Sequence, residues 1–280
     1  MTTIQFHKYQ GIGNDFIIID NRPATGVQTP ATGKLPLEGV NLKDLARKLC
    51  DRHFGIGADG LIIAQPSNRS NVKMQILNSD GSEPEMCGNG IRCLARYIWE
   101  NTPVNDRKDV LSIDTNCGIK VVALIIEDGD LKQVEVDMGE PIYEDKDEEI
   151  LGYRFRRVSM GNPHAVIFLD EINPVDIEEV GSQIEVAPPF PEGTNVEFVQ
   201  VNNRQDISVR VWERGAGSTL ACGTGAAATV VAAVIKQLTD RNVTVHLPGG
   251  DLEIEWDGKD NRVCLRGPAE KVFSGTVEIN

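Results

Sequence analysis

The sequence predicts an α+β fold of two similar halves, each a mostly antiparallel, barrel-like sheet wrapped around one central helix. Short runs of β-forming residues dominate the chain, and helical patterns are few. Two stretches, GSEPEMCGNGIRC (81–93) and GAGSTLACGTGAAA (215–228), each place a Cys-Gly-x-Gly turn before a helical segment. The helix after the second turn is apolar nearly all round, which is typical of a helix buried on every side. Many strands around one buried helix, formed twice, account for these observations.

The individual elements follow from local patterns in chain order. Asn41 begins a segment that places Leu45 and Leu49 on one face, which predicts a helix. Pro174 opens a second short helix, which Gly181 is expected to close. Two further helices follow the two Cys-Gly-x-Gly turns. Strands are expected at 3–9, 16–20, 60–65, 72–77, 110–114, 119–126, 132–138, 165–170, 196–201, 207–212, 243–247, 252–256, 262–267 and 272–279.

An internal repeat extends beyond the two cysteine turns. GIGNDFIIID (11–20) resembles SMGNPHAVIFLD (159–170), since each is a Gly-Asn turn, a hydrophobic strand and a closing Asp. We therefore expect an N-terminal half of residues 1–130 with the first turn and a C-terminal half of residues 131–270 with the second. The last strand, 271–280, is placed where it can return to the first half.

Composition excludes several classes of protein. The formal net charge of −14, with no cluster of Lys and Arg, opposes binding to nucleic acid or to anionic lipid. No apolar run approaches the roughly 20 residues of a membrane span. The N-terminal MTTIQFHKYQGIGNDF lacks the features of a signal or transit peptide. We expect a soluble, cytoplasmic protein whose partner is a small molecule and neither nucleic acid nor a membrane.

The cysteines and histidines indicate no metal site. Six cysteines are scattered along the chain without the paired spacing of a zinc site or the density of a disulfide scaffold. Four are expected to be small buried residues: Cys50, Cys93, Cys117 and Cys264. Three histidines are expected to be structural: His7, His53 and His246. A glycine-rich dinucleotide loop and a lysine in a Schiff-base setting are also lacking, so no cofactor is expected.

The two remaining cysteines suit acid/base chemistry. A cysteine directly before a helix lies among backbone N–H groups that have no partner within the helix, at the positive end of the helix dipole. Both effects favour the thiolate, so Cys87 and Cys222 are expected to act as bases near neutral pH. If the halves face each other, one thiolate removes a proton from a carbon while the other thiol delivers one to the opposite face. Such a pair inverts a stereocentre.

Six motifs in order resemble those of the diaminopimelate epimerase family and cover essentially the whole chain: GIGNDF, DRHFGIGADG, NSDGSEPEMCGNGIRC, GNPH, PEGTNVEF and ERGAGSTLACGTGA. The resemblance implies the diaminopimelate epimerase-like fold and an isomerase that interconverts LL- and meso-2,6-diaminopimelate without pyridoxal phosphate or another cofactor. It places the reaction in lysine and peptidoglycan biosynthesis and implies a homodimer.

The resemblance also implies roles for single residues. Cys87 and Cys222 would be the catalytic pair. The two helix starts would hold the carboxylate at the reacting carbon, through Gly88, Asn89, Gly223 and Thr224. Other residues would bind the remote end of the substrate: Asn14, Asn78, Asn162, Asn195, Glu213 and Arg214. His164 and Glu213 would modulate the thiol pKa values, and many family members carry Gln at the position of Gly60.

Other functions remain open from the residues alone. A proline or hydroxyproline racemase has the same architecture and two opposed cysteines, although a cyclic imino acid would not need Glu213 and Arg214. A thiol redox protein would use a reversible disulfide between Cys87 and Cys222. A binding module would hold ligand without solvent exchange at the α-carbon. Asparagines beside glycine also occur as turns and helix caps, with no ligand.

Overall fold

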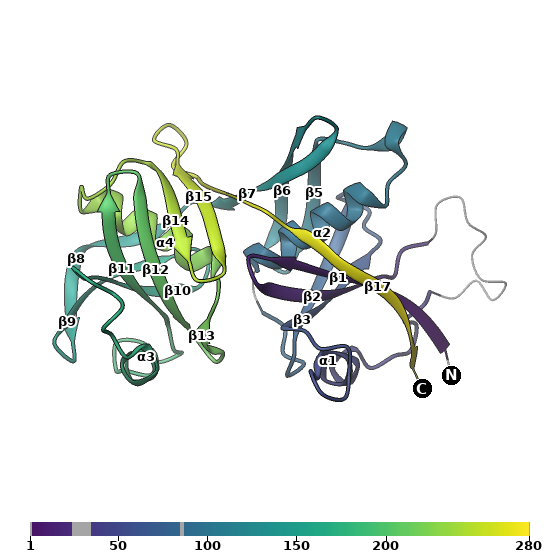
Figure 1. Cartoon of the computed structure of the whole chain (residues 1–280), viewed down its shortest axis with the longest axis horizontal. Coiled ribbons are helices and arrows are strands. Elements are labelled where there is room, and N and C mark those ends of the chain that lie inside the picture. The colour runs from purple at the N-terminus through teal and green to yellow at the C-terminus, as the bar shows by residue number, and fades with distance from the viewer. Residues whose placement is uncertain (1, 24–34, 85–86, 280) are drawn as a thin grey trace. The chain divides into compact units, whose positions relative to one another are not determined.

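The computed structural model describes residues 2–23, 35–84 and 87–279 (Figure 1). The chain divides into two compact units. Unit 1 comprises Met1–Val134 and Pro268–Asn280, and unit 2 comprises Glu135–Gly267. The boundaries expected at residues 130 and 270 differ from these by a few residues.

The sheet of unit 1 has the strand order β17-β1-β2-β3-β4-β5-β6. Neighbouring strands pair antiparallel except β2 with β3 and β4 with β5, which are parallel. The last strand, β17, pairs with β1 so that Ile279 lies opposite Thr2. The strands are β1 (Thr2–Gly11), β2 (Asn14–Asp20), β3 (Gly60–Gln65), β4 (Val72–Asn78), β5 (Val110–Thr115), β6 (Gly118–Glu127) and β17 (Glu270–Ile279), and β7 (Asp130–Gly139) runs on into unit 2.

The sheet of unit 2 has the order β8-β9-β10-β11-β12-β14-β15-β16, and β13 pairs with β12. Its parallel pairs are β10 with β11 and β12 with β14. The strands are β8 (Ile142–Ile150), β9 (Tyr153–Ser159), β10 (Pro163–Phe168), β11 (Asn195–Asn203), β12 (Asp206–Glu213), β13 (Gly217–Thr219), β14 (Asn242–Leu247), β15 (Gly250–Trp256) and β16 (Val263–Gly267).

The two sheets repeat one pattern of pairing. From β17 to β6 the pairs are antiparallel, antiparallel, parallel, antiparallel, parallel and antiparallel. From β8 to β15 the same six kinds of pair follow in the same order. The predicted α+β class with two similar, mostly antiparallel halves is therefore confirmed.

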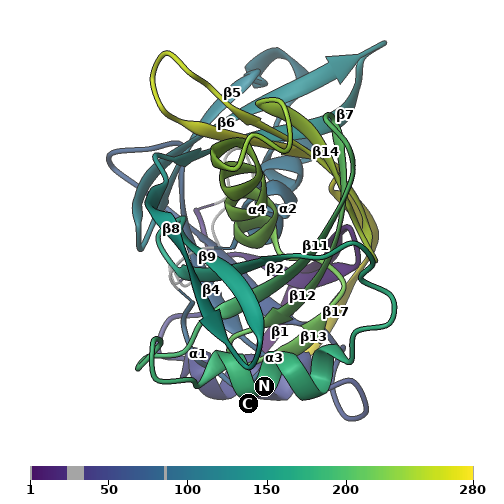
Figure 2. The same ribbon diagram turned by 90° about the vertical axis from the view of Figure 1, so that its left-hand side faces the viewer.

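Each unit has one helix that begins at a cysteine turn. These are α2 (Gly88–Glu100) in unit 1 and α4 (Gly223–Ile235) in unit 2. Every residue of α4 from Gly223 to Ala233 is buried, as the apolar sequence predicted. Figure 2 shows α4 enclosed by strands of unit 2, and it packs on β9, β10, β11, β15 and β16. Its alanines and glycines let these strands approach its backbone closely.

The two shorter helices are α1 (Leu42–Cys50) and α3 (Ile177–Glu185). Asn41 caps α1 as predicted, and its side chain accepts hydrogen bonds from two backbone N–H groups. The expected end of the other helix at Gly181 is wrong, because Gly181 lies in the middle of α3. A Cβ there would come within 2.6 Å of the Trp212 side chain. The glycine is thus a close-packing position and no helix terminator.

Three strands of the described chain were not expected: β8, β9 and β13. Six of the nine residues of β8, IYEDKDEEI, are charged and most of the strand is exposed, so neither alternation nor apolar content marks it. Arg156 on β9 forms ion pairs with Asp145 at 3.0 Å and Asp147 at 2.9 Å, and these hold β8 to its neighbour. Charged residues on such an outer strand also oppose pairing with other chains.

The cysteines that were expected to be structural differ in exposure. Cys50 and Cys93 are buried as expected and Cys264 is partly so, but the expectation for Cys117 is wrong. Cys117 is exposed because it lies in the tight turn between β5 and β6.

Among the described residues, no helix has the length and apolar content to span a membrane.

Candidate active site

The two cysteine turns have the same local geometry. Cys87 caps α2 with an extended backbone (φ −139°, ψ 104°), and Cys222 caps α4 in the same way (φ −123°, ψ 110°). Each Sγ accepts a hydrogen bond from the N–H of the third residue of its helix, Gly90 at 3.3 Å and Gly225 at 3.4 Å. Each sulfur therefore lies at the end of a helix where backbone donors point outward.

In unit 1 the turn brings Cys87 close to Asn14 and Asn89. Asn14 begins β2, and its Oδ1 accepts from Asn89 Nδ2 at 3.3 Å and lies 3.9 Å from Cys87 Sγ. Its Nδ2 donates to Asp59 at 2.9 Å, which fixes the orientation of the amide. The predicted site residues Asn14, Cys87 and Asn89 thus lie together.

Behind the same turn lies Arg92, which the sequence analysis did not single out. Its side chain is fully buried and donates to the Gly88 carbonyl at 3.1 Å, to Asn89 Oδ1 at 2.9 Å and to the Pro268 carbonyl at 3.2 Å. Burial lowers the pKa of Arg92 to about 10, against the opposing effect of Cys93 and Cys87. The only sequence signal was a charged residue on a helix of high apolar content.

Asn78 and Gly60 lie opposite each other at the ends of β4 and β3. Asn78 is exposed, and its Nδ2 donates to Ser82 Oγ at 2.9 Å. A Cβ at Gly60 would meet the Leu77 carbonyl oxygen at 2.8 Å and the Phe16 ring at 3.2 Å. The Leu77 carbonyl and the Phe16 ring therefore occupy the space that a side chain at position 60 would need.

In unit 2 the turn surrounds Cys222 with polar groups. Thr224 Oγ1 lies 3.5 Å from its Sγ, and the thiol also hydrogen bonds to Glu213 at the end of β12. Glu213 in turn accepts from Thr219 Oγ1 at 2.5 Å. Burial raises the pKa of Glu213, although the hydrogen bonds from Thr219 and Cys222 oppose the shift.

The electrostatics of Cys222 differ from the expectation for a helix start. Burial raises the pKa of its thiol well above the ordinary value, and the carboxylates of Glu213 and Glu197 add to the effect. The hydrogen bonds from Thr224 and Gly225 act in the opposite direction but are outweighed. The sequence did not indicate which of the two cysteines is ionised; at Cys222, desolvation outweighs the helix end and favours the thiol.

The remaining predicted residues of unit 2 meet at the start of β10 and β11. The strands are parallel, with His164 opposite Asn195. Asn195 donates to the Pro163 carbonyl at 3.1 Å and accepts from the Arg214 N–H at 2.9 Å, so both ends of its amide are used within the protein. Arg214 itself donates to the Glu192 carbonyl at 3.3 Å.

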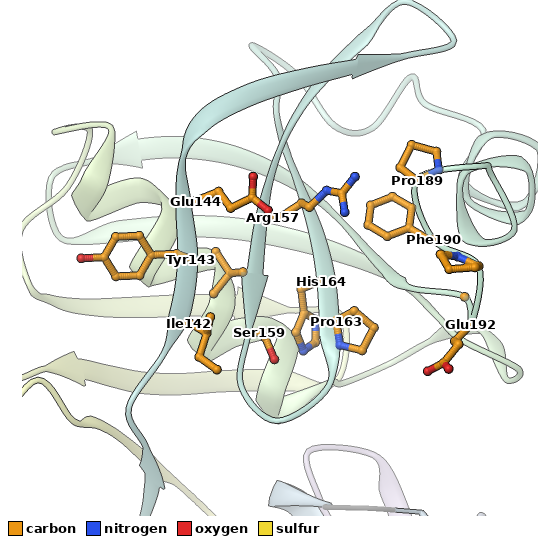
Figure 3. A pocket seen from close by; sticks show the side chains of 13 residues that line it. Ile142, Tyr143, Glu144, Arg157, Ser159, Pro163, His164, Pro189, Phe190 and Glu192 are labelled. Atoms are coloured by element: carbon orange, nitrogen blue, oxygen red, sulfur yellow. The ribbon is translucent and has the colours of Figure 1, made fainter.

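A cavity of about 310 Å³ adjoins these residues in unit 2. It is lined by parts of β8, β9 and β10 and by the 189–193 segment. Figure 3 shows Pro163 and His164 on β10 beside Ser159, with Phe190 and Glu192 across the opening. Among the described residues, no cluster of His, Cys, Asp and Glu could hold a metal ion.

Comparison with known proteins decides the family. A family model described as diaminopimelate epimerase matches residues 6–144 and 156–272. The chain belongs to the diaminopimelate epimerase family. A diaminopimelate epimerase from Desulfitobacterium hafniense is 48% identical over 286 residues, which cover 96% of this chain and 96% of that protein. One from Synechocystis is 45% identical over 295 residues and covers 99% of each.

Solved structures of more distant proteins share the fold. A hydroxyproline epimerase from Agrobacterium vitis has a TM-score of 0.72 at 15% identity, over 98% of this chain and 92% of that chain. A PhzF-family phenazine biosynthesis protein of Bacillus anthracis has a TM-score of 0.71 at 15% identity over the whole of both chains. At 15% identity, these two structures show only that the fold is shared.

Within this member of the diaminopimelate epimerase family, two clusters of predicted residues are present. One gathers Asn14 and Asn89 at Cys87, and the other gathers Asn162, His164, Glu213 and Thr224 around Cys222. Arg92 and Glu197 belong to these clusters and were missed. Each lies in an apolar stretch where a charged side chain gives no sign of its partner.

Proposed function

We propose that this chain interconverts LL-2,6-diaminopimelate and meso-2,6-diaminopimelate, with Cys87 and Cys222 as its two acid/base groups. The observation that carries the proposal is the pair of equivalent helix starts, each with a cysteine sulfur accepting from a backbone N–H. Membership of the family supplies the substrate and places the reaction in lysine biosynthesis.

The reaction needs one base and one acid. A thiolate removes the proton from the α-carbon, and a thiol donates its own proton to the opposite face of the same carbon. Because burial and two carboxylates raise the pKa of Cys222, this residue begins as the thiol. Cys87 then begins as the thiolate. After one turnover the two states are exchanged, and proton exchange with solvent restores them before the next turnover in the same direction.

Negative charge that builds up on the α-carbon and its carboxylate must be stabilised. The N–H groups of Gly88 and Asn89 and those of Gly223 and Thr224 would bind the carboxylate oxygens at the two helix starts. Preorganised donors of this kind are effective when water is excluded, since they need no reorganisation as the charge develops.

The remote amino-acid end of the substrate carries an ammonium and a second carboxylate. The Arg214 guanidinium suits the carboxylate, and amides suit either group. Asn14, Asn78 and Asn162 would contribute such amides. Asn195 would add a fourth amide, and its oxygen also holds the Arg214 backbone by accepting from the Arg214 N–H. Glu213 and His164 adjust the acidity of the thiols.

We also propose the cellular location, oligomeric state and partners of the enzyme. The enzyme works in the cytoplasm as a homodimer, with no cofactor, nucleic acid or membrane partner, and its product also feeds peptidoglycan synthesis. A proline racemase is not favoured, because relatives named as diaminopimelate epimerases are 43–48% identical over nearly the whole chain. A thiol redox protein is disfavoured on the same ground.

The test is exchange at the α-carbon. LL-diaminopimelate is incubated with enzyme in D₂O under full reduction, and deuterium entry and conversion to the meso form are followed by NMR and chiral chromatography. Cys87→Ser and Cys222→Ser should each lose at least about a hundredfold in turnover, since a general acid or base contributes that much or more. Cys117→Ser, which changes an exposed thiol, is the matched control. Full turnover in either active-site variant, or racemisation of L-proline instead, contradicts the proposal.

A further inference from the structure

A fully buried carboxylate lies behind the Cys222 turn. Glu197 is on β11, and its side chain has no exposed surface. A Cβ at Gly225 would come within 2.6 Å of its Oε1, so the carboxylate packs directly against the first turn of α4. Among the described residues, its Oε2 has no hydrogen-bond partner. A buried charge of this kind needs an opposite charge close by.

His164 supplies the contact. Its Nδ1 lies 2.7 Å from Glu197 Oε1, and its Nε2 lies 3.1 Å from Asn162 Oδ1. Asn162 directs its Nδ2 to Thr224 Oγ1 at 3.2 Å, which leaves its oxygen facing the histidine. Both ring nitrogens therefore face oxygen atoms, and both contacts are hydrogen bonds when each nitrogen carries a hydrogen. An imidazolium satisfies both bonds and balances the carboxylate.

The same contacts continue to the reacting sulfur. Thr224 Oγ1 lies 3.5 Å from Cys222 Sγ. One hydrogen-bonded chain therefore runs from Glu197 through His164, Asn162 and Thr224 to the thiol. The other ionisable groups around it are Glu213 beside the thiol and, in the adjoining cavity, Glu144, Arg157 and Glu192.

We propose that Glu197 is a positioning residue for the reaction at Cys222. It holds His164 as an imidazolium, which fixes the direction of the Asn162 amide and hence of the Thr224 hydroxyl beside the sulfur. This inference rests on the proposed epimerase function and extends it to a residue that touches no substrate. Neutralising the carboxylate releases a proton from His164 and lets the amide turn round.

The first measurement needs no turnover. The full chain has four histidines, so nitrogen NMR of histidine-labelled protein resolves their protonation states. In the wild type, both nitrogens of His164 should be protonated, and a His164→Asn sample assigns the signal. In Glu197→Gln one nitrogen should become unprotonated at the same pH. A neutral His164 in the wild type overturns the proposal, whether or not the enzyme epimerises diaminopimelate.

The second measurement is kinetic. Glu197→Gln should lower kcat about tenfold to a hundredfold, the usual cost of removing an outer-shell orienting partner. The Glu197→Gln/His164→Asn double variant should be no slower than the slower single variant, because the chain acts as one unit. Glu135→Gln, which breaks an ion pair with Arg266, controls for a general loss of stability. Additive effects of the two substitutions, or an equal loss in the control, refute the positioning role.

Discussion

Alanine at the third residue of each helix start should have very different effects in the two units. At Gly225 the added Cβ would lie 2.6 Å from Oε1 of Glu197, a side chain with no exposed surface. At Gly90 the nearest atoms are side-chain ends that need to shift only by tenths of an ångström: Cδ1 of Ile76 at 3.0 Å, Cδ1 of Ile62 at 3.2 Å and Sγ of Cys87 at 3.3 Å. Gly225→Ala should therefore be strongly destabilising, and Gly90→Ala should be nearly neutral.

The magnitude follows from three contributions. Overpacking a core costs about 1–3 kcal/mol. Displacing Glu197 also breaks its bond to His164, and an unsatisfied buried polar group costs about 1–3 kcal/mol. Alanine in place of helical glycine returns about 0.5–1 kcal/mol. The net loss is about 1–5 kcal/mol for Gly225→Ala, whereas Gly90→Ala should stay within about 1 kcal/mol of the wild type.

Urea denaturation followed by far-UV circular dichroism measures both variants, and amide hydrogen exchange in α4 shows whether the loss is local. A Glu197→Ala background gives the new methyl group room, so the penalty of Gly225→Ala should fall there by about 1–3 kcal/mol. Equal stability of the two alanine variants would refute the reasoning, as would an unchanged penalty in the Glu197→Ala background.

Two further predictions concern buried charge in unit 1. Arg92→Met should lower the free energy of unfolding by about 2–4 kcal/mol, because two buried oxygens and the part-buried Pro268 carbonyl lose their donor; urea midpoints measure this. Burial alone would raise the pKa of Asp15, but hydrogen bonds from Arg52 and Lys8 hold it at about 2. Its stabilisation, about 2 kcal/mol, is complete above the ordinary value of 3.8 and is lost as the pH falls towards 2. Asp15→Asn should remove this part of the acid dependence in unfolding curves measured between these values, and an unchanged curve would contradict it.

The repeated architecture could be predicted because its signals are local. An apolar helix such as α4 can exist only inside a protein, and a cysteine between short polar residues and a glycine-rich helix start marks where that helix begins. The outer strand β8 could not be predicted in this way. Its charged sequence carries no hydrophobic alternation, and its pairing depends on Arg156 of the next strand.

The missed site residues share a different cause. Glu197 stands between Val196 and Phe198, where period-two alternation predicts that it faces solvent. It is buried because α4 covers that face of the sheet and His164 balances its charge. The predicted helix end at Gly181 was wrong for a related reason. The glycine has no side chain because Trp212 packs closely against it, and it does not form a turn. Such features depend on which elements meet, and one strand or helix does not contain that information.

The two cysteine turns have similar backbone angles, but their sulfur atoms lie beside different charged groups. Behind Cys87 lies a buried cation, Arg92, whereas Cys222 is buried beside the carboxyl group of Glu213, with the Glu197–His164 pair behind it. A cation favours a nearby thiolate, while a carboxylate and desolvation favour the thiol. A repeated scaffold with identical chemistry at both turns would hold two competing bases or two idle acids. In the proposed two-base reaction, the Arg92 cation would favour the thiolate at Cys87, and desolvation together with Glu213 would favour the thiol at Cys222.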